Sequence, residues 1–350
     1  MAFNWFRTYT SEWELVPIDP GGWVELEPLT MVKSFKFNTS GDDDVPLLNS
    51  GSITIDTYEE DPPPGWYKIK GRFISPNGEM ESYPIGVLVC ESSDYNHDYG
   101  LNRLTMSGKS VLFPAKNKYM ANGAYIPRGS DGAEWCRGMI QSCTPAPVSV
   151  DGDMDFTLSR NYVFDNNTSI LKAVWDVLDS AKWVMQIDGD GNIHLLPKPM
   201  QPDIRFEDDA LSLFQPGLSR STPIADIPNV YICNYGNRRV RVVNDDPDNI
   251  VSTVSRGYER ETVDNDPMLV NGESVDNYAA RMLEEQSTLV QTYSYRREVW
   301  DNVMPFDMVY FNIPGFIGEA RVLSQAFDFE GGGIQIDEIV GKEVKLWQMS

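Results

Sequence analysis

Along most of the chain, apolar residues alternate with polar ones at a period of two, which is typical of β-strands with one buried face. In the segment 51–58, Ile53 and Ile55 share one face, so we expect that face to be buried. The segment 66–75 repeats the pattern. The Asn-Gly step at 77–78 after it is a strong hairpin signal, because both residues tolerate positive φ. The N-terminal third therefore reads as an antiparallel meander.

Three segments show helical spacing instead, at 131–143, 168–182 and 274–289. Each carries a single apolar stripe, which predicts a helix docked on a sheet. Asp131 is placed to cap the first helix, with Glu134 three residues later as in a capping box. Thr168 is the expected cap of the second helix.

After the second helix the pattern returns to strands. The segment 183–197 reads as strand, tight turn, strand. Further strands are expected at 230–235, 238–243, 293–300, 308–311, 319–327 and 333–340. The predicted fold class is therefore mainly β with a few packed helices (α+β).

The length and charge of the chain restrict its function. At 350 residues it can bury a large core without metal or disulfide staples, and it suggests two or three domains. Lys plus Arg number 29 and Asp plus Glu 52, so the net charge is −23. Because such an acidic surface repels phosphate groups, we expect neither specific nucleic-acid binding nor attraction to anionic membranes.

The apolar runs, the histidines and the cysteines indicate no membrane span, no histidine-rich metal site and no need for an oxidising compartment. The clearest short apolar run, at 85–90, is far too short to span a bilayer, so we expect no membrane insertion by this chain alone. With only His97 and His194, a histidine-rich metal site is excluded. No CxxC pair occurs, and we expect ordinary buried or half-buried thiols at Cys90, Cys136, Cys143 and Cys233.

Two acidic motifs resemble calcium loops. The segment 188–192 (DGDGN) has oxygen ligands at alternate positions, but the sixth position is Ile193 and the twelfth is Pro199. A hairpin turn is therefore the favoured interpretation, with a metal site as the weaker alternative. A weak calcium site also remains open at Asp151, Asp153 and Asp155, whereas Asp42–Asp44 reads as a solvated loop. We expect no metal and no cofactor.

No catalytic motif stands out, and we expect no enzyme. The sequence has no GxSxG elbow, no GxxxxGK[ST] and no GxGxxG. The glycines at 331–333 read as a hairpin turn, and Cys136 lies on a packing stripe. The many acids single out no pair for glycoside hydrolysis. No catalytic, cofactor-binding or metal-binding residue is therefore assigned.

Two binding surfaces remain open. Arg239 and Arg241 project from one face of a predicted strand, either as a basic strip for a polyanion or as an ion-pair ladder within or between subunits. The nine tryptophans and sixteen tyrosines suit β-rich cores and oligomer interfaces, or a sugar-binding groove.

The order of elements from about Asp155 onward, roughly 55% of the chain, carries a family resemblance. The sequence reads as a helix at 169–183, a hairpin at 188–193, an Asn-Val-Tyr strand at 229–232, an Ala-containing helix at 279–283 and a closing β segment from 305 past 333. This order resembles the baseplate or tail-tip hub proteins of tailed bacteriophages. The same fold family includes the N-terminal half of type VI secretion spike proteins.

The resemblance implies two tube-like β-barrel domains and an α/β insertion. The implied boundaries are 1–115 for the first barrel, 116–200 for the α+β insertion, 201–244 with 299–350 for the second barrel, and 245–298 for a helix-containing insertion. It also implies a homotrimer whose six barrels form a pseudo-sixfold ring. Such a ring would join a sixfold tail tube to a threefold tip and line a DNA channel with an acidic lumen.

The function that follows is that of a structural virion protein, assembled in the host cytoplasm and located in the phage tail. Expected partners are itself, a tail tube or distal tail protein, and a tail spike, fibre or central tip protein. Interfaces would come from barrel edges and from the aromatic N-terminal segment with Trp5, Phe6, Trp13 and Trp23. The alternatives are a glycan- or receptor-binding β protein of the tail tip and a tail-associated cell-wall hydrolase.

Overall fold

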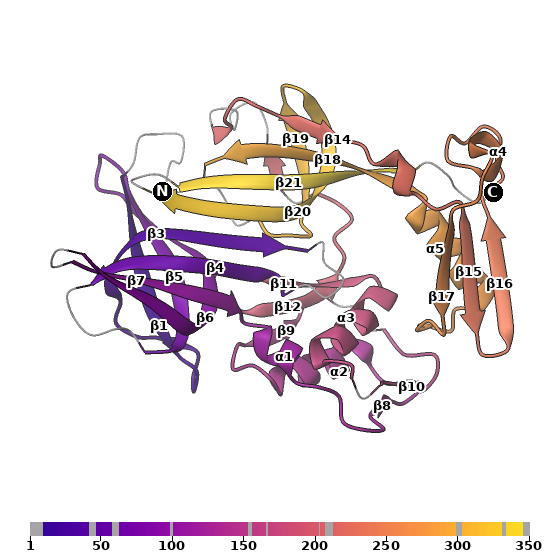
Figure 1. Ribbon diagram of the computed structural model, residues 1–350, viewed down its shortest axis with the longest axis horizontal. Helices are drawn as coiled ribbons and strands as arrows, with labels where there is room; N and C mark the ends of the chain where they lie inside the picture. Colours follow the sequence, from indigo (N-terminus) through magenta and orange to yellow (C-terminus); the bar gives the residue numbers. More distant parts are fainter. Residues whose placement is uncertain are drawn as a thin grey trace.

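The computed structural model describes residues 10–41, 47–57, 63–98, 101–152, 156–165, 167–202, 204–206, 213–298, 303–330 and 334–345. Strands dominate and a few helices pack on them, which confirms the mainly β, α+β class (Figure 1). None of the helices in these ranges is both long and apolar enough to cross a bilayer.

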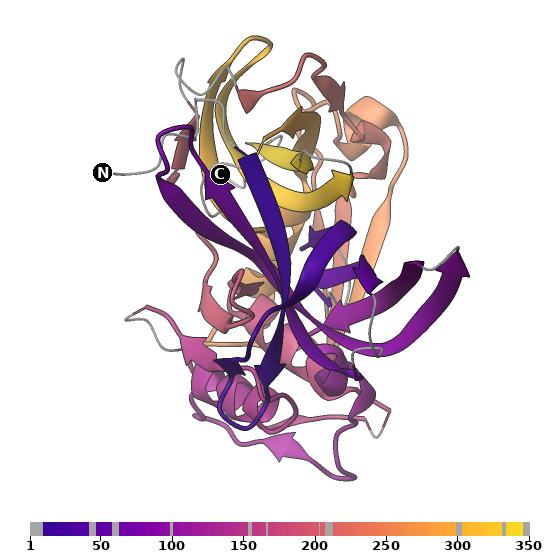
Figure 2. The ribbon, with the colours of Figure 1, turned by 90° about the vertical axis from the view of Figure 1, so that its left-hand side faces the viewer.

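One large sheet contains strands from both halves of the chain. Its N-terminal strands are β1 (Thr10–Asp19), β2 (Val24–Glu25), β3 (Leu29–Ser40), β4 (Asn49–Thr57), β5 (Gly65–Ile74), β6 (Met80–Asp98) and β7 (Leu101–Ser110). Its C-terminal strands are β13 (Ile204–Phe206), β14 (Ser219–Ser221), β18 (Thr288–Arg297), β19 (Met308–Ile313), β20 (Phe316–Glu330) and β21 (Ile334–Lys345). The order along the sheet is β14-β18-β21-β20-β3-β4-β7-β6-β5-β1-β2. Figure 2 shows the twist between the two sets of strands.

The two sets join where β3 pairs antiparallel with β20. Ser40 lies opposite Ser324, and Phe37 lies opposite Phe327. The side chains behind this joint form a shared core in which Trp13 of β1 packs against Phe329 of β20. The predicted alternation is confirmed, since the buried faces of β4 and β5 point into this core.

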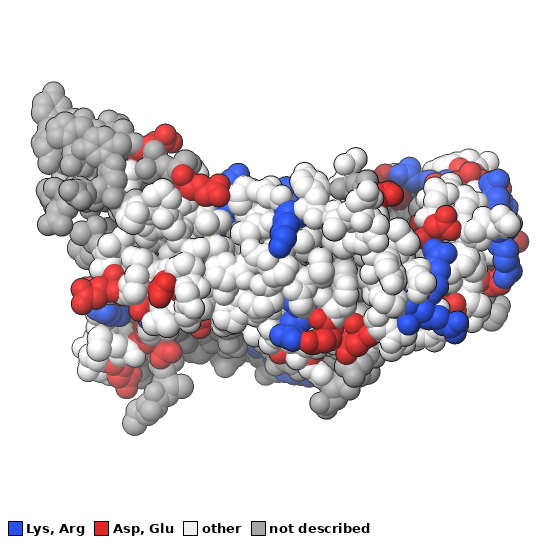
Figure 3. All heavy atoms as spheres, turned by 90° about the horizontal axis from the view of Figure 1, so that it is seen from below, with Lys and Arg blue, Asp and Glu red and all other residues white. Residues whose placement is uncertain are grey.

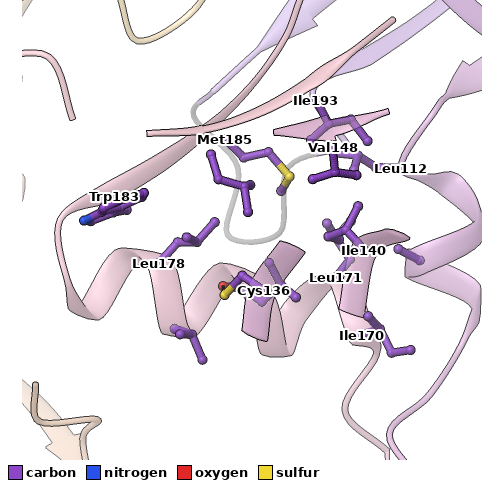
Figure 4. Close-up of a cluster of buried hydrophobic side chains, with 14 of the residues drawn as sticks. Leu112, Cys136, Ile140, Val148, Ile170, Leu171, Leu178, Trp183, Met185 and Ile193 are labelled. Atoms are coloured by element: carbon purple, nitrogen blue, oxygen red, sulfur yellow. Dashed lines mark hydrogen bonds between the residues drawn. The ribbon is translucent and has the colours of Figure 1, made fainter. Parts of the chain in front are cut away.

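An α/β insertion follows the N-terminal strands. It contains α1 (Phe113–Asn117), β8 (Tyr125–Ile126), α2 (Gly132–Gln141), β9 (Val148–Val150), β10 (Tyr162–Val163), α3 (Ile170–Ser180), β11 (Trp183–Ile187) and β12 (Ile193–Pro197). The apolar stripes of α2 and α3 pack on the sheet β11-β12-β9, as the spacing predicted (Figure 4). Cys136 and Ile140 of α2 meet Leu171 and Leu178 of α3 beneath Met185 of β11.

The helix caps follow the sequence signals closely. The Asp131 side chain accepts a hydrogen bond from the Glu134 backbone N–H at 3.1 Å, as predicted. The cap of α3 is Ser169 rather than Thr168, because the Ser169 hydroxyl accepts from the Lys172 backbone N–H. Two adjacent hydroxyl residues offer the same chemistry, so the sequence could not separate them.

A third unit is built on a small sheet. It comprises the 3₁₀ turn Ile224–Asp226, β15 (Val230–Tyr235), β16 (Arg238–Val243), α4 (Thr253–Arg256), β17 (Glu261–Asn265) and α5 (Val275–Gln286). Strand β15 lies between antiparallel β16 and parallel β17, and α5 covers this sheet (Figure 1).

Two placements differ from the boundaries we expected. The hairpin β15–β16 lies in the range 201–244, which we expected to belong to the second barrel. It pairs instead with β17 in a separate sheet and not with the large sheet. Strand β18 was expected within the 245–298 insertion, but it pairs with β21 and β14 in the large sheet. Alternating apolar residues show that a strand has a buried face, but they do not show which sheet covers it.

Candidate functional surfaces

The large sheet has one open face that crosses both halves of the molecule. Six neighbouring strands (β7, β4, β3, β20, β21 and β18) point alternate side chains away from the core. One row across them consists, strand by strand, of Lys109, Ser50, Asn38, Ala326, Asp337 and Arg296. The next row begins, in the same order of strands, with Ser107, Ser52, Lys36 and Asp328. We call this surface the open face.

Small hydroxyl residues and paired charges characterise the open face. Lys36 and Asp328 form an ion pair at 3.3 Å. Arg296 and Asp337 form another at 2.6 Å. Ala326 lies between the two pairs, and serines and Asn38 occupy the neighbouring positions. The Lys109 ammonium lies 5.1 Å from the centre of the Phe113 ring rather than in an ion pair. Although the chain carries a net charge of −23, the residues named on this face therefore carry a small positive excess.

The opposite side of the same strands holds a buried polar network. Glu338 of β21 accepts hydrogen bonds from Arg297 at 2.9 and 3.1 Å, from Gln325 at 2.7 Å and from the Tyr295 hydroxyl. Burial raises the pKa of Glu338, but the Arg297 charge outweighs it and the pKa is lowered overall. Burial by itself lowers the pKa of Arg297, but the Glu338 charge outweighs it and the pKa is raised overall. Both groups are therefore charged, and they hold β18, β21 and β20 in register.

The acidic turn at 188–192 brings the α/β insertion into contact with the N-terminal strands of the large sheet. Asp188 accepts from the Asn192 backbone N–H at 2.8 Å, which closes the predicted hairpin. Asp190 binds the Lys68 ammonium at 2.7 Å, and Glu25 binds the same ammonium at 2.7 Å. Burial lowers the pKa of Lys68, but these two carboxylates raise it overall. The turn therefore docks on the N-terminal strands, with its carboxylates engaged by Lys68 and by the Asn192 backbone.

A close backbone approach fixes how the turn docks. An added Cβ at Gly189 would lie 2.2 Å from the Pro84 carbonyl oxygen, so a larger residue does not fit there. The Trp23 indole N–H donates to the Asp190 carbonyl at 3.1 Å, and the Trp23 and Trp66 rings meet edge to face.

His194 brings together groups that resemble a catalytic triad. Its Nδ1 lies 3.1 Å from the Ser149 hydroxyl and 2.6 Å from Asp151, and its Nε2 lies 3.1 Å from Asp188. The hydrogen bond with Asp188, opposed by burial and reinforced by Asp151, raises the pKa of His194 to about 8. The imidazole is therefore protonated at neutral pH and cannot accept a proton from Ser149. This constellation works as an ionic clamp between β12, the hairpin turn and β9.

The clamp predicts a pH dependence. Because the folded pKa of His194 lies above the usual 6.5, its stabilisation is complete below about pH 6.5 and is lost as the pH rises through about 8. A shift of this size corresponds to about 2 kcal/mol, and solvent screening reduces the expected effect to about 1 kcal/mol. Urea unfolding at pH 6 and pH 9 measures it. In a His194→Gln variant this part of the pH dependence should vanish, and an unchanged profile would contradict the clamp.

The remaining sequence predictions have mixed outcomes. Of the two predicted residues, Arg241 pairs with Glu259 at 2.6 Å, which supports the ion-pair alternative for Arg241 alone. The neighbouring Arg238 pairs with Asp276 at 3.0 Å. Trp13 was expected at an interface but is buried in the core, because its ring packs on neighbouring aromatic side chains.

Other predictions can be tested only in part. Several residues named in the sequence analysis lie outside the described ranges: Asp42–Asp44, Asp153, Asp155, the glycines at 331–333, Trp5 and Phe6. In the described ranges, no group of three or more His, Cys, Asp or Glu side chains is arranged to hold a metal ion. The four cysteines are free thiols, buried at Cys90, Cys136 and Cys233 and half-buried at Cys143, as expected.

This geometry recurs in solved structures. A tail protein from Neisseria meningitidis MC58 superimposes with a TM-score of 0.65 at 11% identity, covering 96% of this chain and 97% of that one. This chain has the fold of phage tail proteins. The 43 kDa tail protein of prophage MuSo2 from Shewanella oneidensis gives a TM-score of 0.63 at 10% identity, over 95% of this chain and 98% of that one.

The tail-protein fold extends to secretion systems. The E. coli c3393 protein, a type VI secretion component described as similar to the T4 tail proteins gp27 and gp5, gives a TM-score of 0.51 at 8% identity. That match covers 90% of this chain and 76% of the other. No family model and no curated protein sequence matches the chain. The predicted resemblance to tail-tip and baseplate hub proteins is therefore confirmed at the level of the fold.

Proposed function

We propose that this chain is a non-enzymatic structural protein of a phage tail, acting as a homotrimeric hub at the tail tip or baseplate. The observation that carries the proposal is the match to tail proteins over nearly the whole length of both chains. The two sets of strands, with one aromatic core shared at the β3–β20 joint and a second one among the C-terminal strands, would supply two tube-like barrels per subunit. Three subunits would then form a pseudo-sixfold ring between a sixfold tube and a threefold tip.

The open face is the surface best suited to line a DNA channel. Apart from Lys109, the charges named on this face are paired, and its other side chains are mostly small and polar, so a passing phosphate backbone would find a single lysine rather than a cluster of cations to hold it. We therefore propose a nearly neutral channel wall, with the excess acidic residues lying elsewhere on the virion protein.

Exposed strand edges would supply the contacts between subunits and with neighbouring tail proteins. Among the described strands, β14 and β16 each pair on one side only, which leaves their other edges free for further pairing. The proposed partners are a tail tube or distal tail protein on one side and a spike, fibre or central tip protein on the other.

Light scattering of the purified chain at several concentrations tests the trimer. We expect a mass of about three times 39.5 kDa, near 119 kDa, because a hub on a threefold axis requires three subunits. A stable dimer would contradict the proposal, because a twofold particle cannot cap a threefold axis.

Cysteine labelling of the same particle tests the channel. In a Cys143→Ser background, Ser52→Cys on the open face should react with a small maleimide but not with one carrying a long polyethylene glycol chain. Ser255→Cys, placed on α4 outside the open face, should react with both reagents. Equal reaction of Ser52→Cys with both would place the open face on the outside of a trimer.

A further inference from the structure

A groove of about 530 Å³ lies on the α/β insertion, away from the open face. It runs between the segment 118–125 and helix α2, and its principal side chains are Tyr119, Asn122, Tyr125, Trp135 and Met139. Its size falls within the usual range of small-ligand sites. Nothing in the hub proposal uses this groove.

Aromatic rings on this groove are unusually exposed. Tyr119 is 61% exposed and Tyr125 is 55% exposed, and Val163, opposite Tyr125 in the β8–β10 ribbon, is 68% exposed. Single exposed apolar residues are ordinary, but a contiguous group beside a concave surface marks a place where something binds.

The walls of the groove are fixed before any ligand arrives. The Met120 backbone N–H donates to the Thr168 carbonyl at 2.9 Å, and Ile126 is fully buried, so the segment that bears both tyrosines is held at each end. On the other wall, the Trp135 ring lies parallel to Phe164 with the ring centroids 5.6 Å apart. Such preorganisation reduces the entropic cost of binding.

The polar groups of the groove favour an uncharged ligand. The Lys118 ammonium donates to the Ser142 carbonyl at 3.0 Å, so it is already engaged. The Asn122 side chain is exposed on the groove and can exchange hydrogen bonds with a ligand. Figure 3, which views the molecule from the side of the insertion, shows a broad area with few charged side chains in the middle of this face.

We propose that this groove binds a neutral saccharide. Aromatic rings pack against the C–H faces of a pyranose, while tyrosine hydroxyls and the Asn122 amide exchange hydrogen bonds with its hydroxyl groups. A purely apolar ligand would bury those polar groups without partners, which costs free energy. An anionic ligand would be repelled by the net charge of −23. The groove would thus give a tail protein a second role, contact with surface glycans.

Saturation-transfer NMR with maltotriose, cellotriose and triacetylchitotriose tests the site in the full chain. We expect at least one of these trisaccharides to receive saturation from the protein. Tyr119→Ala and Tyr125→Ala should each weaken that binding about tenfold, or about 1.4 kcal/mol. Both side chains are mostly exposed, so both variants should fold normally, as unfolding midpoints would show. Tyr258→Ala, which removes a tyrosine 53% exposed on the third unit, is the matched control and should bind like the wild type.

Three results would overturn the proposal. One is the absence of saturation transfer to all three sugars at millimolar concentration. Another is equal binding by the Tyr119→Ala and Tyr258→Ala variants. The third is a fall in solution mass in Tyr119→Ala or Tyr125→Ala, which would make the groove a contact between copies of the chain. The hub proposal is independent of these outcomes, since its own test is the mass of the wild-type particle.

Discussion

Replacing Glu338 with leucine is expected to lower the free energy of unfolding by about 3–5 kcal/mol, because it leaves a buried guanidinium without its counter-charge. The side chains of Arg297 and Glu338 are 1% and 0% exposed, so water cannot replace the lost partner. The change also removes the acceptor for Tyr295 and Gln325, which adds unpaired buried donors.

Urea unfolding measures this loss, and the neighbouring ion pair supplies the control. Arg296 and Asp337 lie on the same two strands, one position away, but 45% and 54% of their side chains are exposed. Asp337→Ala should therefore cost less than about 1 kcal/mol. The double variant Arg297→Met with Glu338→Leu should recover part of the stability lost in Glu338→Leu, because no charge remains buried. If Glu338→Leu and Asp337→Ala cost the same, the buried network does not hold the strands.

Replacing Trp13 with alanine is expected to cost about 3–5 kcal/mol, the usual range for emptying a buried aromatic site. The ring is 2% exposed. It packs on Phe35 and Phe73 of the N-terminal strands and on Phe329 of β20, with ring centroids 4.9, 5.6 and 5.3 Å away. The cavity would therefore open between the two sets of strands rather than at a surface.

The Trp13→Phe variant distinguishes the effect of the ring volume from the effect of the buried indole N–H. The Trp13 indole N–H is buried without a hydrogen-bond partner, so its loss removes an unfavourable group while the smaller ring leaves a smaller cavity. We expect Trp13→Phe to lower the thermal unfolding midpoint by less than half as much as Trp13→Ala does. Met80→Ala, at a site 67% exposed, should leave the midpoint almost unchanged. A Trp13→Ala midpoint close to wild type would mean that the two sets of strands do not depend on this core.

The elements that could be predicted are those whose signals are local. The alternation around Ile53 and Ile55, the stripe of α2 with its Asp131 cap and the hairpin turn at 188–192 each depend on neighbouring residues only, and the structure has all three. The strand β17 was missed because Glu261–Asn265 carries little apolar alternation. Its pairing with β15 is parallel and depends on a connection that no local pattern reveals.

The functional surfaces were less predictable for the same reason. The open face consists of serines, lysines and aspartates that look like ordinary solvent positions in each strand. Their significance comes from the pairing of β3 with β20, which no local pattern indicates. The groove beside Trp135 likewise combines a loop with a helix, although the abundance of aromatic residues indicated that such a surface could exist.

The pairing of β3 with β20 also affects how the protein is made. These strands are separated by more than two hundred residues, so β3 leaves the ribosome long before its partner exists. Until then its edge is unpaired, and the core around Trp13 lacks Phe329. An exposed edge beside an incomplete aromatic core is a recognised route to aggregation during synthesis. The N-terminal strands can therefore reach their final stability only after the last strands have been translated, and a chaperone has a defined interval in which to protect them.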